Sequence, residues 1–297
     1  MPPRGSVETL APSMMRPRLV LCCTLLGLAP LACGPGTDPD PGVDGDSKAV
    51  DFDHLTITVN GRAEVFPEAA RLLESQGQPL PALDGMAITI EEPLRVSVND
   101  PRSALGHSAI NSGGEFSVSD VPVREVNLSL AATVAHEGLV RTSTIVFDTV
   151  FTRTRPRLDI IGARAWALPV SFHDALTRSV GDANIRGHTG ERARTLREAG
   201  FVLGRVVDVS GAPVAGARVV LDRPELASHV YYPAADFQSA SQDATSATGL
   251  FVYVHSGGET ETFSVSVEGS TSYLPRHAGG TPGLGLVLTL SPGNAPP

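Results

Sequence analysis

Three aromatic side chains are the residues of this chain that could best bind a ligand. Tyr231, Tyr232 and Phe237 lie in the segment HVYYPAADFQ, residues 229–238, which interrupts a regular alternation of apolar residues. Aromatic rings on an exposed loop can stack on sugars or on peptides, so this segment is a candidate ligand loop. The alternative, which we favour, is that Val230 and Tyr232 form a strand while Tyr231 lies over the domain edge.

The common catalytic motifs are incomplete in this sequence. His136-Glu137 begins the zinc motif H-E-x-x-H, but Val140 occupies the position of the second histidine. Glu91 and Glu92 are adjacent, and successive side chains of a strand point to opposite faces, so they cannot act as an acid/base pair. The sequence also lacks the G-x-x-x-x-G-K phosphate loop. It therefore predicts no catalytic residue, no cofactor and no metal site.

Residues 33–52 form an acidic stretch rich in proline and glycine. Four of its aspartates, Asp38, Asp40, Asp44 and Asp46, offer the oxygen ligands that calcium takes. Their spacing lacks the D-x-D-x-D-G order, however, and no glutamate closes the loop. A segment with so few apolar side chains behaves as a solvated chain, so we interpret it as a tether.

The first 32 residues have the character of an export signal. Arg16 and Arg18 precede an uncharged run, residues 19–29, which is too short to cross a bilayer as a helix. The run leads into Leu-Ala-Pro-Leu-Ala-Cys-Gly, residues 28–34. This sequence resembles the lipobox of bacterial lipoproteins, although Pro30 stands where that family usually has leucine.

The lipobox resemblance implies that Cys33 is lipidated; an ordinary secretory signal cut nearby is the alternative. Cys22 and Cys23 would leave with the signal, so Cys33 would be the one cysteine of the mature chain. In lipoproteins, aspartate directly after the lipidated cysteine signals inner-membrane retention. Gly34 stands there instead, so the resemblance implies an outer-membrane lipoprotein of the bacterial cell envelope, attached to the membrane through its N-terminal anchor.

The charge balance excludes some partners. The formal net charge of the chain is −9, and it becomes more negative when the signal leaves with three arginines and one glutamate. Such a surface argues against nucleic acid as a partner and against adhesion to anionic lipid heads.

The C-terminal third has the pattern of an antiparallel β-sandwich. Short alternating runs are separated by glycine and proline. The residues G-R-V-V-D-V-S-G-A-P-V-A-G-A-R-V-V-L (204–221), followed by T-G-L-F-V-Y (248–253), resemble the carboxypeptidase regulatory-like domain, a transthyretin-like sandwich of seven strands. The resemblance implies that residues 201–292 adopt this fold. Gly216 would allow a positive φ or a close backbone approach, and Pro213 would preset the turn.

A degenerate copy of this domain is predicted upstream, at residues 53–159. Five positions match at one constant spacing: Leu83, Gly85, Ile88, Ile90 and Pro93 correspond to Val214, Gly216, Val219, Leu221 and Pro224. A first strand is expected at residues 54–61, and helix formers after an N-terminal proline predict a short helix at residues 67–76.

Residues 160–200 are predicted to form a helical connector. Phe172, Leu176 and Val180 lie on one helical stripe that ends at Gly181, and a second short helix ends at Gly200. We expect Trp166, the single tryptophan, to have a packing role in this connector.

A metallopeptidase domain sometimes precedes the regulatory-like domain, which prompts a search for its zinc site. His188-Thr189-Gly190-Glu191 spells the H-x-x-E of that site. The site also needs a third ligand far downstream on a large α/β scaffold, and here only the sandwich follows. An exposed turn beside a charged residue is the favoured interpretation.

The sequence thus predicts a mainly β protein of two antiparallel transthyretin-like or Ig-like sandwiches joined by a short helical segment. We expect a lipid-anchored envelope protein that is not an enzyme and serves as a structural or ligand-binding module. An envelope protein or a glycan would be its partner, because the motifs specify a scaffold whose loops suit recognition. The alternatives are a carbohydrate-binding surface module and a divergent zinc hydrolase using His188 and Glu191.

Overall fold

The apolar alternation that begins at Phe201 produces a strand, β9 (Phe201–Val206), that is buried on both faces. Phe201 and Leu203 pack among helical side chains, whereas Val202 and Val206 pack against a second sheet. Successive residues of a strand point to opposite faces, so one strand contributes to two cores. The predicted alternation of this segment is confirmed.

The structure, a computed structural model, describes residues 51–149 and 154–293. The predicted signal peptide, Cys33, and the tether as far as residue 50 lie outside the described residues. Among the described helices, none is both long enough and apolar enough to span a membrane.

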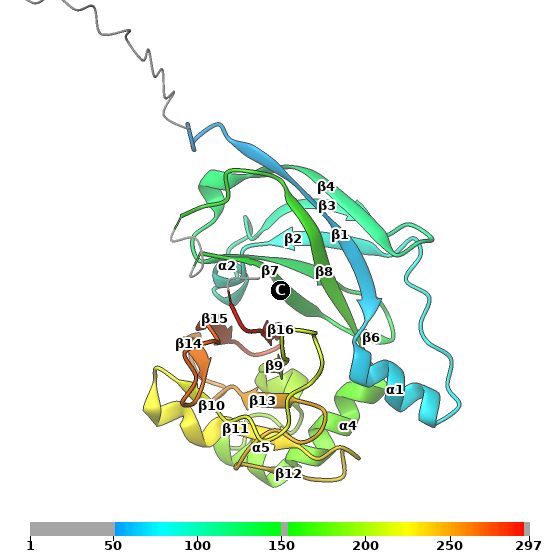
Figure 1. The fold of residues 1–297 in the computed structure, drawn as a ribbon, viewed down its shortest axis with the longest axis vertical. Coiled ribbons are helices and arrows are strands. Elements are labelled where there is room, and N and C mark those ends of the chain that lie inside the picture. Colours follow the sequence, from blue (N-terminus) through cyan, green and yellow to red (C-terminus); the bar gives the residue numbers. More distant parts are fainter. Residues whose placement is uncertain (1–50, 150–153, 294–297) are drawn as a thin grey trace, which may run out of the picture. The chain divides into compact units, whose positions relative to one another are not determined.

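The described strands form three sheets (Figure 1). In spatial order, the N-terminal sheet contains β4 (Glu115–Pro122), β1 (Thr56–Val65), β8 (Ile160–Pro169) and β6 (Leu139–Val140). The C-terminal sheet contains β10 (Val219–Leu221), β14 (Glu261–Val267) and β15 (Arg276–Gly280). The long sheet contains β12 (Ala240–Ser241), β11 (Val230–Pro233), β13 (Leu250–Val254), β9, β16 (Gly285–Leu290), β7 (Thr142–Asp148), β5 (Ser129–Val134), β2 (Ala87–Glu91) and β3 (Ala104–Ala109).

Helices flank these sheets. They are α1 (Pro67–Ser75), α2 (Pro93–Ser97), α4 (Val170–Val180), α5 (Asp182–Thr189) and α6 (Leu196–Ala199), with 3-10 helices η1 (Val123–Glu125) and η2 (Pro224–His229). The predicted short helix after the first strand is confirmed as α1. The predicted mainly β class is confirmed as well.

The same strand order occurs in both halves of the described chain. β1 pairs with β4 antiparallel and with β8 parallel, just as β9 pairs with β13 antiparallel and with β16 parallel. The second layer repeats too, because β2, β5 and β7 form an antiparallel set that matches β10, β14 and β15. Each half is therefore a sandwich with the same pairing scheme.

Residues that match in the two halves also occupy matching conformations. Gly85 and Gly216 both have φ of 74°, a region that L side chains rarely adopt. Pro93 and Pro224 each begin a short helix directly after a matching strand. The matched glycine and proline pairs thus lie at equivalent turns and helix starts.

The two halves differ from the expected pair of separate sandwiches at one place. β7 of the first half pairs in parallel with β16 of the second, in the register Gly285 to Thr142 through Val287 to Thr144. This pairing makes the long sheet continuous from one half to the other. Backbone hydrogen bonding, rather than a helical linker alone, joins the sandwiches.

The connector is only partly helical. Residues Ile160–Pro169, predicted as part of it, form β8, because this segment pairs with β1 and completes the N-terminal sheet. Trp166 therefore lies on a strand, where its ring packs edge-on against Phe66. The helices follow from Val170, and they cover one face of β9 and β13.

Local signals explain where these helices stop. The predicted stripe of Phe172, Leu176 and Val180 is buried on α4, which ends at Gly181 with φ of 89°. At Gly200, φ is 85°, and a Cβ there would lie 1.9 Å from the carbonyl oxygen of Thr281. Only glycine fits that position without a shift of backbone.

Candidate functional site

The aromatic segment lies in the protein interior rather than on an exposed loop. Val230–Pro233 forms β11, and the exposed fractions of Tyr231, Tyr232 and Phe237 are 6%, 3% and 6%. Tyr231 and Phe237 pack with the helices, while the Tyr232 hydroxyl accepts a hydrogen bond from the backbone N–H of Val219 at 2.9 Å. These rings therefore fill two cores and leave no open face on which a ligand could stack.

His188 and Glu191 point to different partners. The Nε2 atom of His188 lies 2.7 Å from the Tyr231 hydroxyl, and its ring centroid is 4.0 Å from that of His229. Burial, together with the neighbouring His229, lowers the pKa of His188 to about 4. Glu191 is exposed and pairs with Arg186 at 3.6 Å. The H-x-x-E spacing thus does not bring the two side chains to one metal position.

A line of polar groups continues inward from His229. The ring of His229 stacks on Tyr253, whose hydroxyl donates a hydrogen bond to the Glu261 carboxylate. Burial raises the pKa of Tyr253 well above its ordinary value, and the bond to Glu261 adds to this effect. Nowhere in residues 51–149 and 154–293 do three or more His, Cys, Asp or Glu side chains gather as metal ligands. The line joins η2, β13 and β14 to one another.

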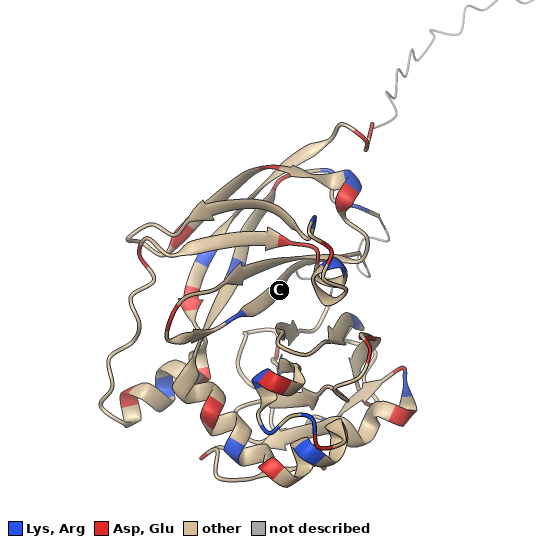
Figure 2. Cartoon of the chain, turned by 180° about the vertical axis from the view of Figure 1, so that it is seen from behind, with Lys and Arg blue, Asp and Glu red and all other residues tan. Residues whose placement is uncertain are grey.

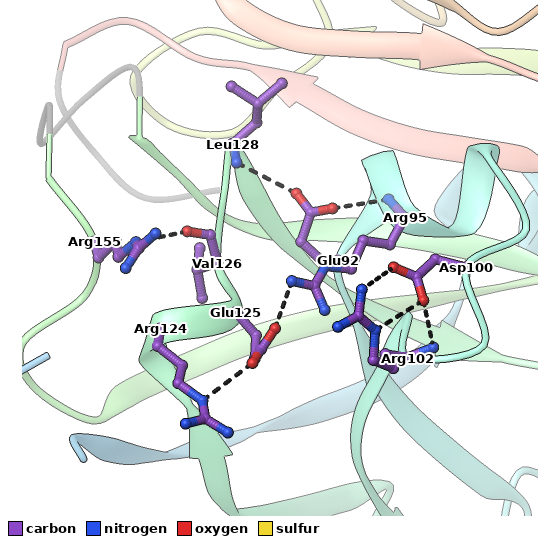
Figure 3. Close-up of polar contacts among 9 residues, drawn as sticks. All are labelled: Glu92, Arg95, Asp100, Arg102, Arg124, Glu125, Val126, Leu128 and Arg155. Carbon is purple, nitrogen blue, oxygen red and sulfur yellow. Dashed lines mark hydrogen bonds and ion pairs between the residues drawn. The ribbon is translucent and has the colours of Figure 1, made fainter. Parts of the chain in front are cut away.

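Glu91 and Glu92, adjacent in sequence, bind different partners, because Glu91 ends β2 whereas Glu92 is the N-cap residue of α2. The Glu91 carboxylate accepts hydrogen bonds from Thr133 at 2.6 Å and from Arg141 at 2.6 Å. Glu92 is fully buried, and its carboxylate accepts from the backbone N–H groups of Arg95 and Leu128, at 2.9 and 3.3 Å (Figure 3). Glu92 thereby caps α2 and ties it to β5.

Ion pairs continue from α2 to the turn before β5. Arg95 contacts Glu125 at 2.5 Å, and Arg124 contacts the same carboxylate at 3.1 Å (Figure 3). The bond from Arg95 lowers the pKa of Glu125. Here again, opposite charges connect neighbouring elements of the first sandwich.

The most deeply buried charged cluster lies where the two sandwiches meet. Asp148, at the end of β7, accepts from the backbone N–H of His277 at 2.9 Å and lies 2.8 Å from the Nδ1 atom of that ring. Its carboxylate also lies 3.4 Å from Nε of Arg276. Asp148 and Arg276 are each 1% exposed. Because β15 belongs to the second sandwich, this cluster fastens one sandwich to the other.

A second set of contacts supports the same junction. The backbone carbonyl of Ser97, at the end of α2, accepts hydrogen bonds from the hydroxyls of Thr260 and Thr281, at 2.9 and 3.3 Å. The described helices and turns carry many of the charged residues, of both signs (Figure 2). The buried Asp148 and Arg276, by contrast, lie on the strands β7 and β15.

Sequence reasoning did not identify the junction residues. Asp148 and His277 are 129 positions apart, and neither belongs to a local motif. Asp148 ends the strand Thr142–Asp148, which is buried along almost all of its length. A charged residue closing a buried strand is the one signal that could have indicated a partner.

No family model and no curated protein matches this chain. Among solved structures, it is similar to a streptococcal ancillary pilin, at 11% identity and a TM-score of 0.23, over 80% of this chain and 69% of the pilin. It is also similar to a minor pilin of Streptococcus agalactiae, at 10% identity and a TM-score of 0.22, over 81% of this chain and 98% of that one. A shaft pilin of Lactobacillus rhamnosus GG has 10% identity and a TM-score of 0.21, over 82% of this chain and 100% of the pilin. Similarity at this level says nothing about what this chain binds or does.

Proposed function

We propose that this chain is a lipid-anchored protein of the bacterial cell envelope whose folded part is a stiff, non-enzymatic structural module. In this proposal, Cys33 carries the lipid, residues 33–52 are the tether, and the two sandwiches stand away from the outer membrane. We also propose that the sandwiches are of the carboxypeptidase regulatory-like type, on the strength of the pairing scheme that both halves share.

The observation that supports the structural role is the continuous long sheet. Strands β7 and β16 extend one hydrogen-bonded ladder through both sandwiches. A backbone ladder resists hinge motion far better than the polar interface that usually separates two domains. The buried Asp148 cluster reinforces that ladder from the adjacent β15. A module built in this way holds its two ends at a fixed distance and orientation.

Substitution of Cys33 by alanine tests the anchor. Thioether-linked acyl chains bind membranes through buried methylene groups, so the wild-type chain should sediment with the outer membrane and Cys33→Ala should appear in the soluble fraction. Cys23→Ala, within the predicted signal, is the matched control and should leave the wild-type distribution unchanged. Membrane association of Cys33→Ala equal to that of the wild type would exclude the lipid anchor.

Carbohydrate binding is the second candidate function, at a place other than the predicted aromatic loop. The three rings of that loop are buried, but a crevice at the junction of the two sandwiches is lined by arginine and hydroxyl side chains together with Trp166 and aliphatic residues.

A further inference from the structure

A crevice of about 400 Å³ opens between the two sandwiches. Its lining includes Thr144 of β7 and Thr289 of β16, the two strands that join the halves. One wall comes from β8 of the first sandwich and the other from β9 and the turn that follows it. The volume is at the lower end of the range of small-molecule sites, which often lie at such interfaces between domains.

A buried arginine with spare hydrogen-bonding capacity lines this crevice. Arg205, on β9, is 8% exposed, and its Nη2 atom pairs with Glu68 of α1 at 3.2 Å. Its Nε atom is buried and has no hydrogen-bond partner among the described residues. An unmade hydrogen bond from a buried charged group is costly, so this N–H favours an acceptor brought by a ligand.

Positive charge exceeds negative charge around Arg205. Arg164, on the opposite wall, lies over the ring of Trp166 and has no ion pair within the described part of the chain. Arg71 contacts the same Glu68 carboxylate at 3.6 Å. Burial lowers the pKa of Arg205, and the nearby charges of Arg71 and Arg164 lower it further. The Glu68 carboxylate thus contacts two guanidinium groups, those of Arg205 and Arg71.

The rim of the crevice reduces this excess only in part. Asp208 lines it, but one oxygen of its carboxylate already accepts bonds from the backbone N–H groups of Ser210 and Ala212, at 2.8 and 3.0 Å. Ser291 and Thr289 add hydroxyl groups, which can donate as well as accept. The lining thus offers two guanidinium groups, together with hydroxyl groups that can bind a polar ligand.

We propose that this crevice binds an acidic sugar of the uronic-acid type, with its carboxylate between Arg164 and Arg205 and its ring hydroxyls toward Thr289 and Ser291. Guanidinium groups match carboxylates in geometry and charge, and hydroxyl-lined walls complement a sugar ring. The inference deepens the proposed function, because it rests on the proposal that this module binds glycans of the envelope. It does not depend on the lipid anchor.

Calorimetric titration of the full-length chain with digalacturonate, and with neutral galactobiose as the comparison, tests the site. Digalacturonate should bind at least tenfold more tightly than galactobiose, and Arg164→Gln should weaken its binding at least tenfold. Arg164 is exposed, so this change leaves the cores intact. Arg218→Gln is the matched control, because Arg218 is also exposed, pairs with Glu268 and does not line the crevice; it should bind as the wild type does.

A double variant extends the test to the buried pair. Arg205→Gln alone would leave the Glu68 carboxylate buried without its partner, so it is combined with Glu68→Gln, and the double variant should also lose binding at least tenfold. The proposal is overturned by absence of digalacturonate binding at millimolar concentration, by equal binding of galactobiose, or by unchanged binding in Arg164→Gln. Equal binding of an Asp-Asp dipeptide would show a general carboxylate site and would overturn it as well. A failed Cys33→Ala fractionation would leave each of these outcomes unaffected.

Discussion

Gly204 lies directly opposite Phe251 in the antiparallel pair β9·β13, and the aromatic ring covers the space that a side chain would take. A Cβ at this position would lie 1.9 Å from Cζ of Phe251. Aromatic side chains often cover a glycine of the neighbouring strand in this way. The glycine therefore allows the Phe251 ring to pack in the second sandwich, although glycine in general weakens a strand.

Substitution of Gly204 by alanine should destabilise the folded state by about 1 to 3 kcal/mol, since the ring of Phe251 must leave its place in a filled core. Urea unfolding followed by circular dichroism measures this loss as a lower midpoint. Gly187→Ala is the matched control, because Gly187 is helical and nothing lies within 4 Å of the added Cβ. It should be neutral or slightly stabilising. An unchanged midpoint for Gly204→Ala would show that the ring does not occupy this position.

At the scale of elements, strands with strict alternation were predictable from sequence. Glu261–Val267 alternates in this way and forms β14, while the apolar runs Leu250–Val254 and Gly285–Leu290 follow glycine turns and form β13 and β16. By contrast, Ile160–Pro169 contains alanines and a tryptophan without clear alternation, and only pairing with β1 makes it a strand. Tertiary contacts often override weak local preference in this way.

The candidate site was less predictable than the strands, because its parts come from distant elements. The aromatic residues Tyr231 and Phe237 were recognisable as unusual, but the sequence did not reveal that helices cover them. The crevice is lined by residues of β7, β8, β9 and β16, and its two arginines, Arg164 and Arg205, belong to no common local motif. Its location depends on the β7·β16 pairing, and neither segment alone contains a sequence signal that predicts this pairing.

The contact between β7 and β15 makes a pH-dependent contribution to stability. The hydrogen bond to Asp148 raises the pKa of His277; Asp222 acts in the same direction, and burial and Arg276 oppose it. The folded protein thus binds this proton more tightly than the unfolded chain. The stabilisation is complete below the unfolded-state pKa of histidine and is lost as pH rises through the higher folded-state value.

Relative to the wild type, His277→Gln should therefore lower the free energy of unfolding more at pH 5.5 than at pH 8.5, as measured by urea titration at both pH values. His107→Gln, on the edge strand β3, serves as the control, because its side chain is exposed and away from the junction. Equal losses at the two pH values for His277→Gln would contradict a proton-linked contact at this place.

At the scale of the whole molecule, the account depends on the two sandwiches moving as one body. Two domains joined by a linker reorient independently by default. Here a parallel strand pair, a buried charged cluster and hydrogen bonds accepted by the last residue of α2 all cross the junction. The crevice proposed to bind an acidic sugar needs this rigidity, since its two walls belong to different sandwiches.

Residual dipolar couplings of backbone amides in a weakly aligned sample of the full-length chain test this claim most directly. Amides of β1 and β4 report on the first sandwich, and amides of β13 and β14 report on the second. The shared sheet predicts one alignment tensor, equal in magnitude and orientation, for both sets. Two tensors of different magnitude would show that the sandwiches tumble separately, and they would contradict the stiff module proposed for this protein.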